Sequence, residues 1–184
     1  MHPSFKDEGI VAIFDKAYIS RFLYKGKMEP HEDLLLQSQR QLEIAHHLLD
    51  ESYPFVKDPK MLPAILEHIY YALDYSITAL LRFERNHKRI AAYKDDFDEK
   101  YALLKKVAKR YKLKATGLDE IQVLFVKQKV TLIAFVRKED FVMVDHKIHT
   151  LSTAKLKGFL SKTKVFIDGI HNSLRTEVLK SAQQ

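Results

Sequence analysis

Arg82 and His87 are the residues whose types and spacing are best suited to chemistry. Four residues separate them in the run from Arg82 to Arg89. A guanidinium can neutralise a phosphodiester, and an imidazole can act as an acid or a base near neutral pH. The pair therefore predicts phosphate binding or cleavage, with Arg82 holding the phosphate and His87 moving the proton. The same run is also typical of the solvated end of a helix, so both interpretations stay open.

Two further pairs resemble parts of a metal site. Glu43 and His46 have the spacing that puts a carboxylate and an imidazole on one helix face, and His146 with His149 forms a looser pair. A di-iron bundle needs a second such pair and two more inward-facing carboxylates. The predicted central helix offers only Glu67, His68 and Asp74 as inward-facing candidates. We therefore predict no metal site.

Several common enzyme classes lack their sequence motifs here. The chain has no phosphate-binding Gly-rich loop, no Gly-x-Ser-x-Gly elbow and no dinucleotide fingerprint. It also has no cysteine, which excludes disulfides, thiolate metal sites and cysteine nucleophiles. We expect no cofactor and leave catalysis open, and any activity would be that of a metal-independent endoribonuclease.

The positive charge of the chain is concentrated in one segment. Residues 82–114 carry twelve cations and five acids, which accounts for the whole formal net charge of +7. Residues 100–114 hold seven cations and no acid. Such a strip attracts polyanions, although a well-solvated helix whose charges complement its dipole explains the same pattern. The candidate nucleic-acid-binding residues are Lys105, Lys106, Lys109, Arg110 and Lys112.

The elements that must position these residues are mostly helical. Apolar residues recur at helical spacing in residues 7–24 and again from Leu35 to about Ser52. Prolines predict a loop over residues 53–59. The most apolar segment, residues 62–84, has Pro63 in its first turn and an apolar stripe formed by Leu66, Ile69, Leu73, Ile77 and Leu80. We expect it to be the central helix of a bundle.

The second half of the chain combines helices with a small ribbon. Acids at residues 95–99 open a helix that we expect to stop at Thr116-Gly117, and length favours a helix over residues 118–135. Short β-favouring runs predict a ribbon of two or three strands over residues 135–151. Ser152 is a good N-cap for a final helix.

Length and composition complete the predicted architecture. A chain of 184 residues with 46% hydrophobic and 30% charged residues is expected to form a single domain, 1–184, that folds without disulfide bonds or a structural metal ion. We divide it into an N-terminal helix (1–28), a helical bundle core (29–134), a β-ribbon (135–151) and a C-terminal helix (152–184). The expected fold class is mainly α, an antiparallel helical bundle with a small β-ribbon before a long C-terminal helix.

The setting and the oligomeric state follow from the same patterns. No apolar run reaches the roughly 18 residues of a membrane helix, and the N-terminus lacks the layout of a signal peptide. We expect a cytoplasmic protein that does not insert into a membrane. Because bundles often bury an exposed stripe by two-fold pairing, we expect a homodimer.

One stretch runs from Leu35 to Leu81 and ends in ILEHIYYALDYSITALL, and Asp95-Asp96-Phe97 opens the next predicted helix. These segments resemble the first two helices and the opening of the third helix of HEPN domains, and the resemblance covers residues 33–135. The resemblance implies an antiparallel helical bundle that dimerises. It also implies a metal-independent ribonuclease in those members that carry an arginine and a histidine separated by four to six residues.

Arg82 and His87 fit the spacing of that family motif but depart from it in two ways. The family has a polar residue after the arginine, where this chain has Phe83, and its motif lies near the start of the fourth helix. The non-catalytic members, which bind RNA, nucleotides or proteins, are therefore the closer comparison.

Three hypotheses for function remain. The first is a HEPN-like module that binds RNA or another polyanion through the basic strip, without base-specific contacts. The second is a metal-independent ribonuclease that uses Arg82 and His87. The third is a protein-interaction scaffold whose basic helix meets an acidic protein partner.

Overall fold

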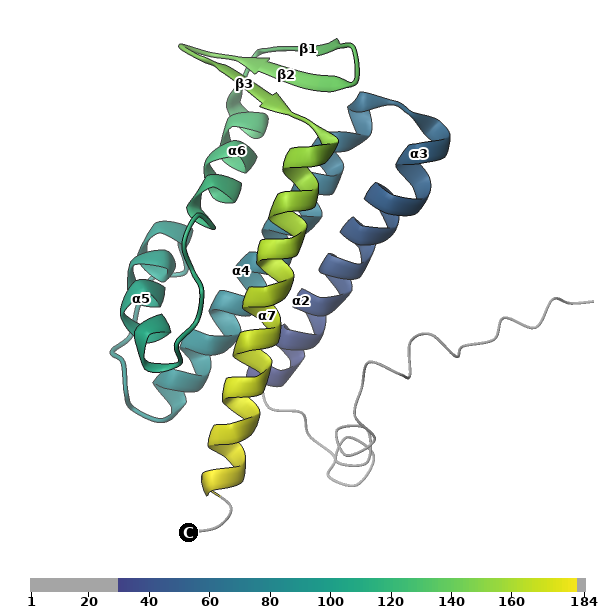
Figure 1. The fold of residues 1–184 in the computed structure, drawn as a ribbon. Helices are drawn as coiled ribbons and strands as arrows, with labels where there is room; N and C mark the ends of the chain where they lie inside the picture. Colours follow the sequence, from purple (N-terminus) through teal and green to yellow (C-terminus); the bar gives the residue numbers. More distant parts are fainter. Residues whose placement is uncertain (1–29, 182–184) are drawn as a thin grey trace, which may run out of the picture.

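The computed structural model describes residues 30–181 as a bundle of long helices with a small sheet across one end (Figure 1). The predicted helix over residues 7–24 lies outside the described residues. The elements, in chain order, are α2 (Pro30–His47), the π-helical turn η1 (Leu48–Ser52), α3 (Tyr53–Val56), the 3-10 turn η2 (Pro59–Met61), α4 (Leu62–Asn86), α5 (Phe97–Arg110), α6 (Asp119–Val130), β1 (Ile133–Arg137), β2 (Asp140–Val144), β3 (Ile148–Leu151) and α7 (Thr153–Ser181). The expected mainly helical fold, with a ribbon before a long final helix, is confirmed.

The apolar helix α4 is the centre of the bundle, as its sequence predicts. It packs against α2, α5, α6 and α7. The five stripe residues of α4, from Leu66 to Leu80, are all fully buried. Burying large aliphatic side chains contributes about 1.5–3 kcal/mol each, so this helix supplies much of the stability of the fold.

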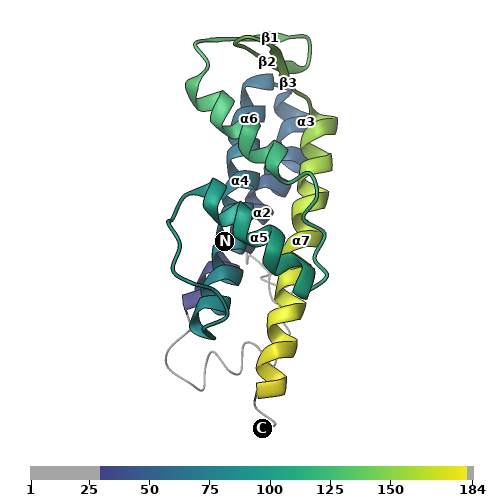
Figure 2. The same cartoon turned by 90° about the vertical axis from the view of Figure 1, so that its left-hand side faces the viewer.

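The long helices differ in direction. In Figure 1, α2 runs toward the sheet while α4 and α7 run away from it. The C-terminal ends of α4 and α7 consequently lie together, where Arg89 contacts Glu177. Figure 2 shows α5 and α6 one after the other along one side of α4 and α7.

The ribbon is a three-stranded antiparallel sheet in the order β1-β2-β3. Its inner face reaches the core through Met143 and Leu151, which are buried in the same cluster as the helices. A hydrogen bond from the Tyr53 hydroxyl to the Glu139 carbonyl oxygen (3.3 Å) and an ion pair between Lys127 and Asp145 also hold it to the bundle.

Three predicted boundaries were wrong. Residues 53–56 are helical rather than a loop, because Pro54 occupies the first turn of α3, where a missing N–H costs nothing. The helix predicted to reach Phe135 ends at Val130, because β1 pairs with β2 from Ile133 onward. The basic helix α5 ends at Arg110 rather than at Thr116-Gly117.

A lysine ends α5 early by adopting a conformation that usually belongs to glycine. Lys112 has a φ of 54°, and the Leu113 N–H returns to the Ala108 carbonyl oxygen at 2.9 Å. This left-handed turn with a six-to-one hydrogen bond is a Schellman cap. Neither Lys112 nor Leu113 is a glycine, so the sequence carries no signal for this helix end.

A candidate polyanion-binding surface

The basic helix α5 turns one face to the core and a lysine face to solvent. Its start is capped by Asp96, whose Oδ1 accepts a hydrogen bond from the Glu99 N–H at 2.9 Å. Tyr101 and Leu104 are buried against the bundle. The predicted binding residues Lys105, Lys106 and Lys109 are all exposed on the opposite side, and Lys112 is exposed in the turn that follows.

These four lysines carry positive charge that no acid compensates. Within residues 30–181, no carboxylate lies at ion-pair distance from Lys105, Lys106, Lys109 or Lys112. The Lys105 ammonium lies over the Tyr101 ring, 4.8 Å from its centre, which is a cation–π contact and leaves the charge in place. We call these four residues the lysine face.

Lys100, which the sequence also places in the strip, lies inside the molecule. Its Nζ contacts Asp74 Oδ1 at 2.5 Å and Asp95 Oδ1 at 3.0 Å, and donates to Thr78 Oγ1 at 3.2 Å. Burial lowers the pKa of Lys100, but the two carboxylates overcome that effect and raise it above its ordinary value. Lys100 therefore fixes α5 to α4 and is not available to a ligand.

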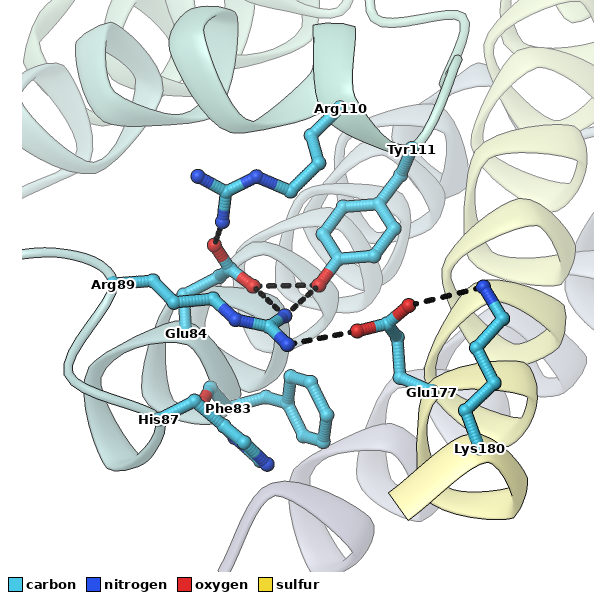
Figure 3. A network of polar contacts seen from close by, with 8 residues as sticks. All are labelled: Phe83, Glu84, His87, Arg89, Arg110, Tyr111, Glu177 and Lys180. Carbon is cyan, nitrogen blue, oxygen red and sulfur yellow. Dashed lines mark hydrogen bonds and ion pairs between the residues drawn. The ribbon is translucent and has the colours of Figure 1, made fainter. Parts of the chain in front are cut away.

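Arg110 is also paired, and its partner is a fully buried carboxylate. Glu84 on α4 has no exposed surface. One of its oxygens pairs with Arg110, and the other accepts hydrogen bonds from the Tyr111 hydroxyl (2.5 Å) and Arg89 Nη1 (3.1 Å). Figure 3 shows the three donors converging on this carboxylate. A buried carboxylate is tolerated only with such partners.

The turn at the end of α4 brings Arg89 back to Glu84. Lys88 has a φ of 57°, and the Arg89 N–H donates to the Glu84 carbonyl oxygen at 2.9 Å. The chain therefore reverses by a second Schellman cap. Because the cap places Arg89 beside the preceding helical turn, its side chain reaches the Glu84 carboxylate.

Arg89 extends the network to α7. Its Nη2 donates to Glu177 Oε2 at 2.8 Å, and the other Glu177 oxygen lies 3.5 Å from Lys180 Nζ (Figure 3). The hydrogen bond from Arg89 lowers the pKa of the Glu177 carboxyl. Burial, reinforced by the hydrogen bond to Glu84, raises the pKa of the Tyr111 hydroxyl. We call Glu84, Arg89, Arg110, Tyr111 and Glu177 the Glu84 network; it joins the ends of α4, α5 and α7.

An open pocket of about 310 Å³ lies beside this network. Lys112 lines it from the end of α5, and Asn172, Ser173 and Thr176 line it from α7. Lys112, Asn172 and Ser173 can donate hydrogen bonds to a polar group there, whereas the Thr176 hydroxyl already donates to the Asn172 carbonyl oxygen and the Glu177 carboxylate also lines the pocket.

The loop after α5 lies close against α7. A Cβ on Gly169 would lie 2.9 Å from Leu113 Cδ2, so glycine permits this approach. Lys162 Nζ on α7 lies 3.4 Å from the Cβ position of Gly117, which has a φ of 75°. Lys162 therefore places a positive charge of α7 beside the loop that follows α5.

The structure does not bring Arg82 and His87 into contact. Five residues along a helix correspond to a rotation of about 500°, so the two side chains project about 140° apart. His87 Nδ1 donates to the Phe83 carbonyl oxygen at 2.9 Å, and its ring lies 4.2 Å from the Phe83 ring centre. Nε2 remains for proton transfer. Nothing in the structure tests their catalytic role, which stays a prediction.

The histidine pairs do not form metal centres in the described chain. No three His, Asp or Glu side chains within residues 30–181 are grouped so that they would hold a metal ion. His46 lies 3.5 Å from Asp50 and His149 lies 3.3 Å from Asp145. Glu84 and His87 form a second Glu-x-x-His pair that our sequence reasoning missed.

Comparison with protein-family models, with curated proteins and with solved structures finds no match. Among the described residues, no helix is both long enough and apolar enough to cross a membrane.

Proposed function

We propose that this protein binds RNA, or another polymer of phosphates, through the lysine face of α5. The observation that carries the proposal is that Lys105, Lys106, Lys109 and Lys112 are exposed and have no acidic partner in residues 30–181. Releasing the counterions condensed on a polyanion favours its binding to such a surface.

Three of the eight other cations in residues 82–114 are paired, which supports a division of roles. Arg89, Lys100 and Arg110 are each held by carboxylates. These cations anchor α5, whereas the lysine face is turned outward. Arg110, which the sequence groups with the binding residues, is in this proposal a positioning residue.

The proposed binding is independent of base sequence. Lysines are point charges that contact phosphates, and phosphate contacts carry no sequence information directly. The lysine face offers no asparagine, glutamine or arginine that would read a base edge. We expect single-stranded RNAs of equal length and different sequence to bind equally well.

The proposal is tested by removing the four charges and comparing the result with a matched control. The test variant carries Lys→Gln at positions 105, 106, 109 and 112. The control carries Lys→Gln at positions 57, 60, 147 and 164, where the lysines are also exposed and have no ion pair within residues 30–181. Both variants lose the same net charge.

Binding of a labelled single-stranded RNA is measured by fluorescence anisotropy. We expect the loss of affinity in the test variant to be roughly several hundred-fold larger at about 0.1 M salt than at about 1 M salt, since four phosphate contacts of about 0.7 each give a log–log slope of about 2.8. The control variant keeps most of the wild-type affinity. Equal losses in the two variants would show that only net charge matters and would overturn the proposal.

The same proteins and labelled RNA also test the two other hypotheses for function. If the protein is a scaffold for an acidic protein, neither wild type nor variants bind RNA at physiological salt. If it is a ribonuclease using Arg82 and His87, the RNA is shortened during incubation, and His87→Ala abolishes the shortening.

A further inference from the structure

The face of the ribbon turned away from Met143 and Leu151 carries exposed apolar side chains on β1 and β3. A ribbon with one face on the core normally carries polar residues on the other. Met143 and Leu151 mark the inner face. The strand register puts Ile133, Phe135, Val144 and Ile148 on the opposite face, together with Val142, which is buried at the centre of the sheet.

Exposed apolar side chains continue from this face along the chain. Ile133 is 60% exposed and Ile148 is 71% exposed, and Leu132, just before β1, is 100% exposed. Phe135 and Val136 of β1 and Val126 and Val130 of the preceding helix α6 are also at least 40% exposed. Their exposed parts together amount to roughly several hundred Å², and an apolar patch of that size on a protein surface marks an interaction site.

β1 also has an open hydrogen-bonding edge. It is the outer strand of the sheet within the described residues. Arg137 pairs with Asp140 across a two-residue turn, so residues 133, 135 and 137 exchange hydrogen bonds with β2. The N–H and C=O groups of Ala134 and Val136 consequently point to the open edge.

This edge lacks the features that keep sheet edges apart. Exposed edges usually carry lysine, proline or a bulge, which blocks pairing with another strand. Residues 132–136 read LIAFV, with no charge and no proline. All five residues of β1 are exposed. An edge of this kind is stable in solution when another strand covers it.

We propose that β1 pairs antiparallel with β1 of a second copy of this chain, about a two-fold axis at Phe135. Ala134 of each copy then lies opposite Val136 of the other, and both residues direct their backbone groups outward. Phe135 faces Phe135, and the two ribbons join into one six-stranded sheet.

The pairing is self-complementary, as a two-fold interface requires. In this register Arg137 lies opposite Ile133, and Lys138 lies opposite Leu132, so no like charges oppose each other. The proposed dimer contacts through β1, whereas the sequence led us to expect contact through a helical stripe. It does not depend on RNA binding.

The oligomeric state gives the first test. We expect wild-type protein to sediment as a dimer at concentrations of about 10 to 100 µM. Ile133→Lys puts two lysines opposite two Arg137 side chains, so it yields a monomer with an unchanged circular dichroism spectrum. The control Val165→Lys alters a 55%-exposed residue of α7 and remains a dimer.

Disulfide trapping tests the register, because the chain has no cysteine of its own. Phe135→Cys places two thiols across the axis with Cα atoms about 4.5 Å apart, so mild oxidation yields a covalent dimer. Ile133→Cys is the control, because its two copies are separated by about 13 Å.

Two outcomes overturn the proposal. One is a wild-type protein that stays monomeric throughout the concentration range. Binding of that monomer to lipid vesicles, which would cover the apolar face in another way, would overturn the proposal equally. The other is a dimer in which Ile133→Cys is trapped as readily as Phe135→Cys, or in which Phe135→Cys is not trapped.

Discussion

Removing the Tyr111 hydroxyl tests whether the Glu84 network holds α5 in place. Tyr111→Phe keeps the ring and removes only the oxygen, which donates to the buried Glu84 carboxylate at 2.5 Å and accepts from Arg89 Nη1 at 3.0 Å. Arg89 keeps Glu84 and Glu177 as partners. The fully buried Glu84 carboxylate loses one of its three hydrogen-bonding partners.

The expected cost is about 2 kcal/mol, because hydrogen bonds to buried charged groups contribute roughly 1.5–3 kcal/mol. With a urea m-value of about 2 kcal/mol/M, the unfolding midpoint falls by about 1 M. Tyr75→Phe is the control, because the half-buried Tyr75 has no hydroxyl hydrogen bond within the described residues. It changes the free energy of unfolding by less than about 0.5 kcal/mol.

A double-mutant cycle with Arg89→Ala sharpens the result. Residues of one hydrogen-bond network are coupled by about 0.5–3 kcal/mol, so the two losses do not add. Two results would contradict this role of the Glu84 network. One is a Tyr111→Phe variant whose free energy of unfolding matches that of wild type within about 0.5 kcal/mol, and the other is an effect that simply adds to that of Arg89→Ala.

Two other stability predictions follow from the described side chains. Gly158→Ala stabilises the protein by about 0.5–1 kcal/mol in urea unfolding, because alanine favours a helix interior and no atom lies within 4 Å of the new Cβ; Gly169→Ala gains less, since its Cβ meets Leu113 at 2.9 Å. Burial lowers the pKa of both His68 and His171, so on acidification the unfolded chain takes up protons first. Stability is therefore lost as pH falls from about 7.5 through about 6.5 toward the folded pKa values. Replacing both histidines with glutamine flattens this dependence, and an unchanged slope would contradict it.

The sequence predicted the parts of the fold that local patterns control. The apolar stripe of α4 predicts that this helix is the centre of the bundle, and all five residues of the stripe are buried. Asp96 and Ser152 cap α5 and α7 as side-chain chemistry dictates, since each accepts a hydrogen bond from a backbone N–H three residues later.

The wrong boundaries depend on contacts that local patterns do not contain. Residues 131–135 continue an apolar pattern that fits a helix, and only pairing with β2 makes Ile133–Arg137 a strand. Lys88 and Lys112 adopt left-handed conformations that glycine usually adopts at helix ends, so the sequence carries no signal for these turns. The Schellman hydrogen bonds and the packing of Leu113 on Gly169 offset that strain.

The candidate surface was predicted only in part, for the same reason. The count of cations between residues 82 and 114 was right, but it did not show which of them are compensated. Lys100 pairs with Asp74 on another helix, and Arg89 pairs with Glu177, which lies 88 positions further along the chain. In the sequence, Glu84 is a single acid at the basic end of a predicted helix. In the structure it is fully buried, and its contacts with Arg110 and Tyr111 fix the end of α5 to α4.

The salt dependence of RNA binding tests the central claim most directly. Binding of a labelled single-stranded RNA is measured between about 50 and about 200 mM salt for wild type and for the variant with Lys→Gln at positions 105, 106, 109 and 112. Four phosphate contacts predict a log–log slope of about −3 for wild type, a roughly 50-fold loss over this range, and a slope near zero for the variant. Equal slopes for the two proteins, or no dependence on salt, would contradict the claim that the lysine face binds the phosphate backbone.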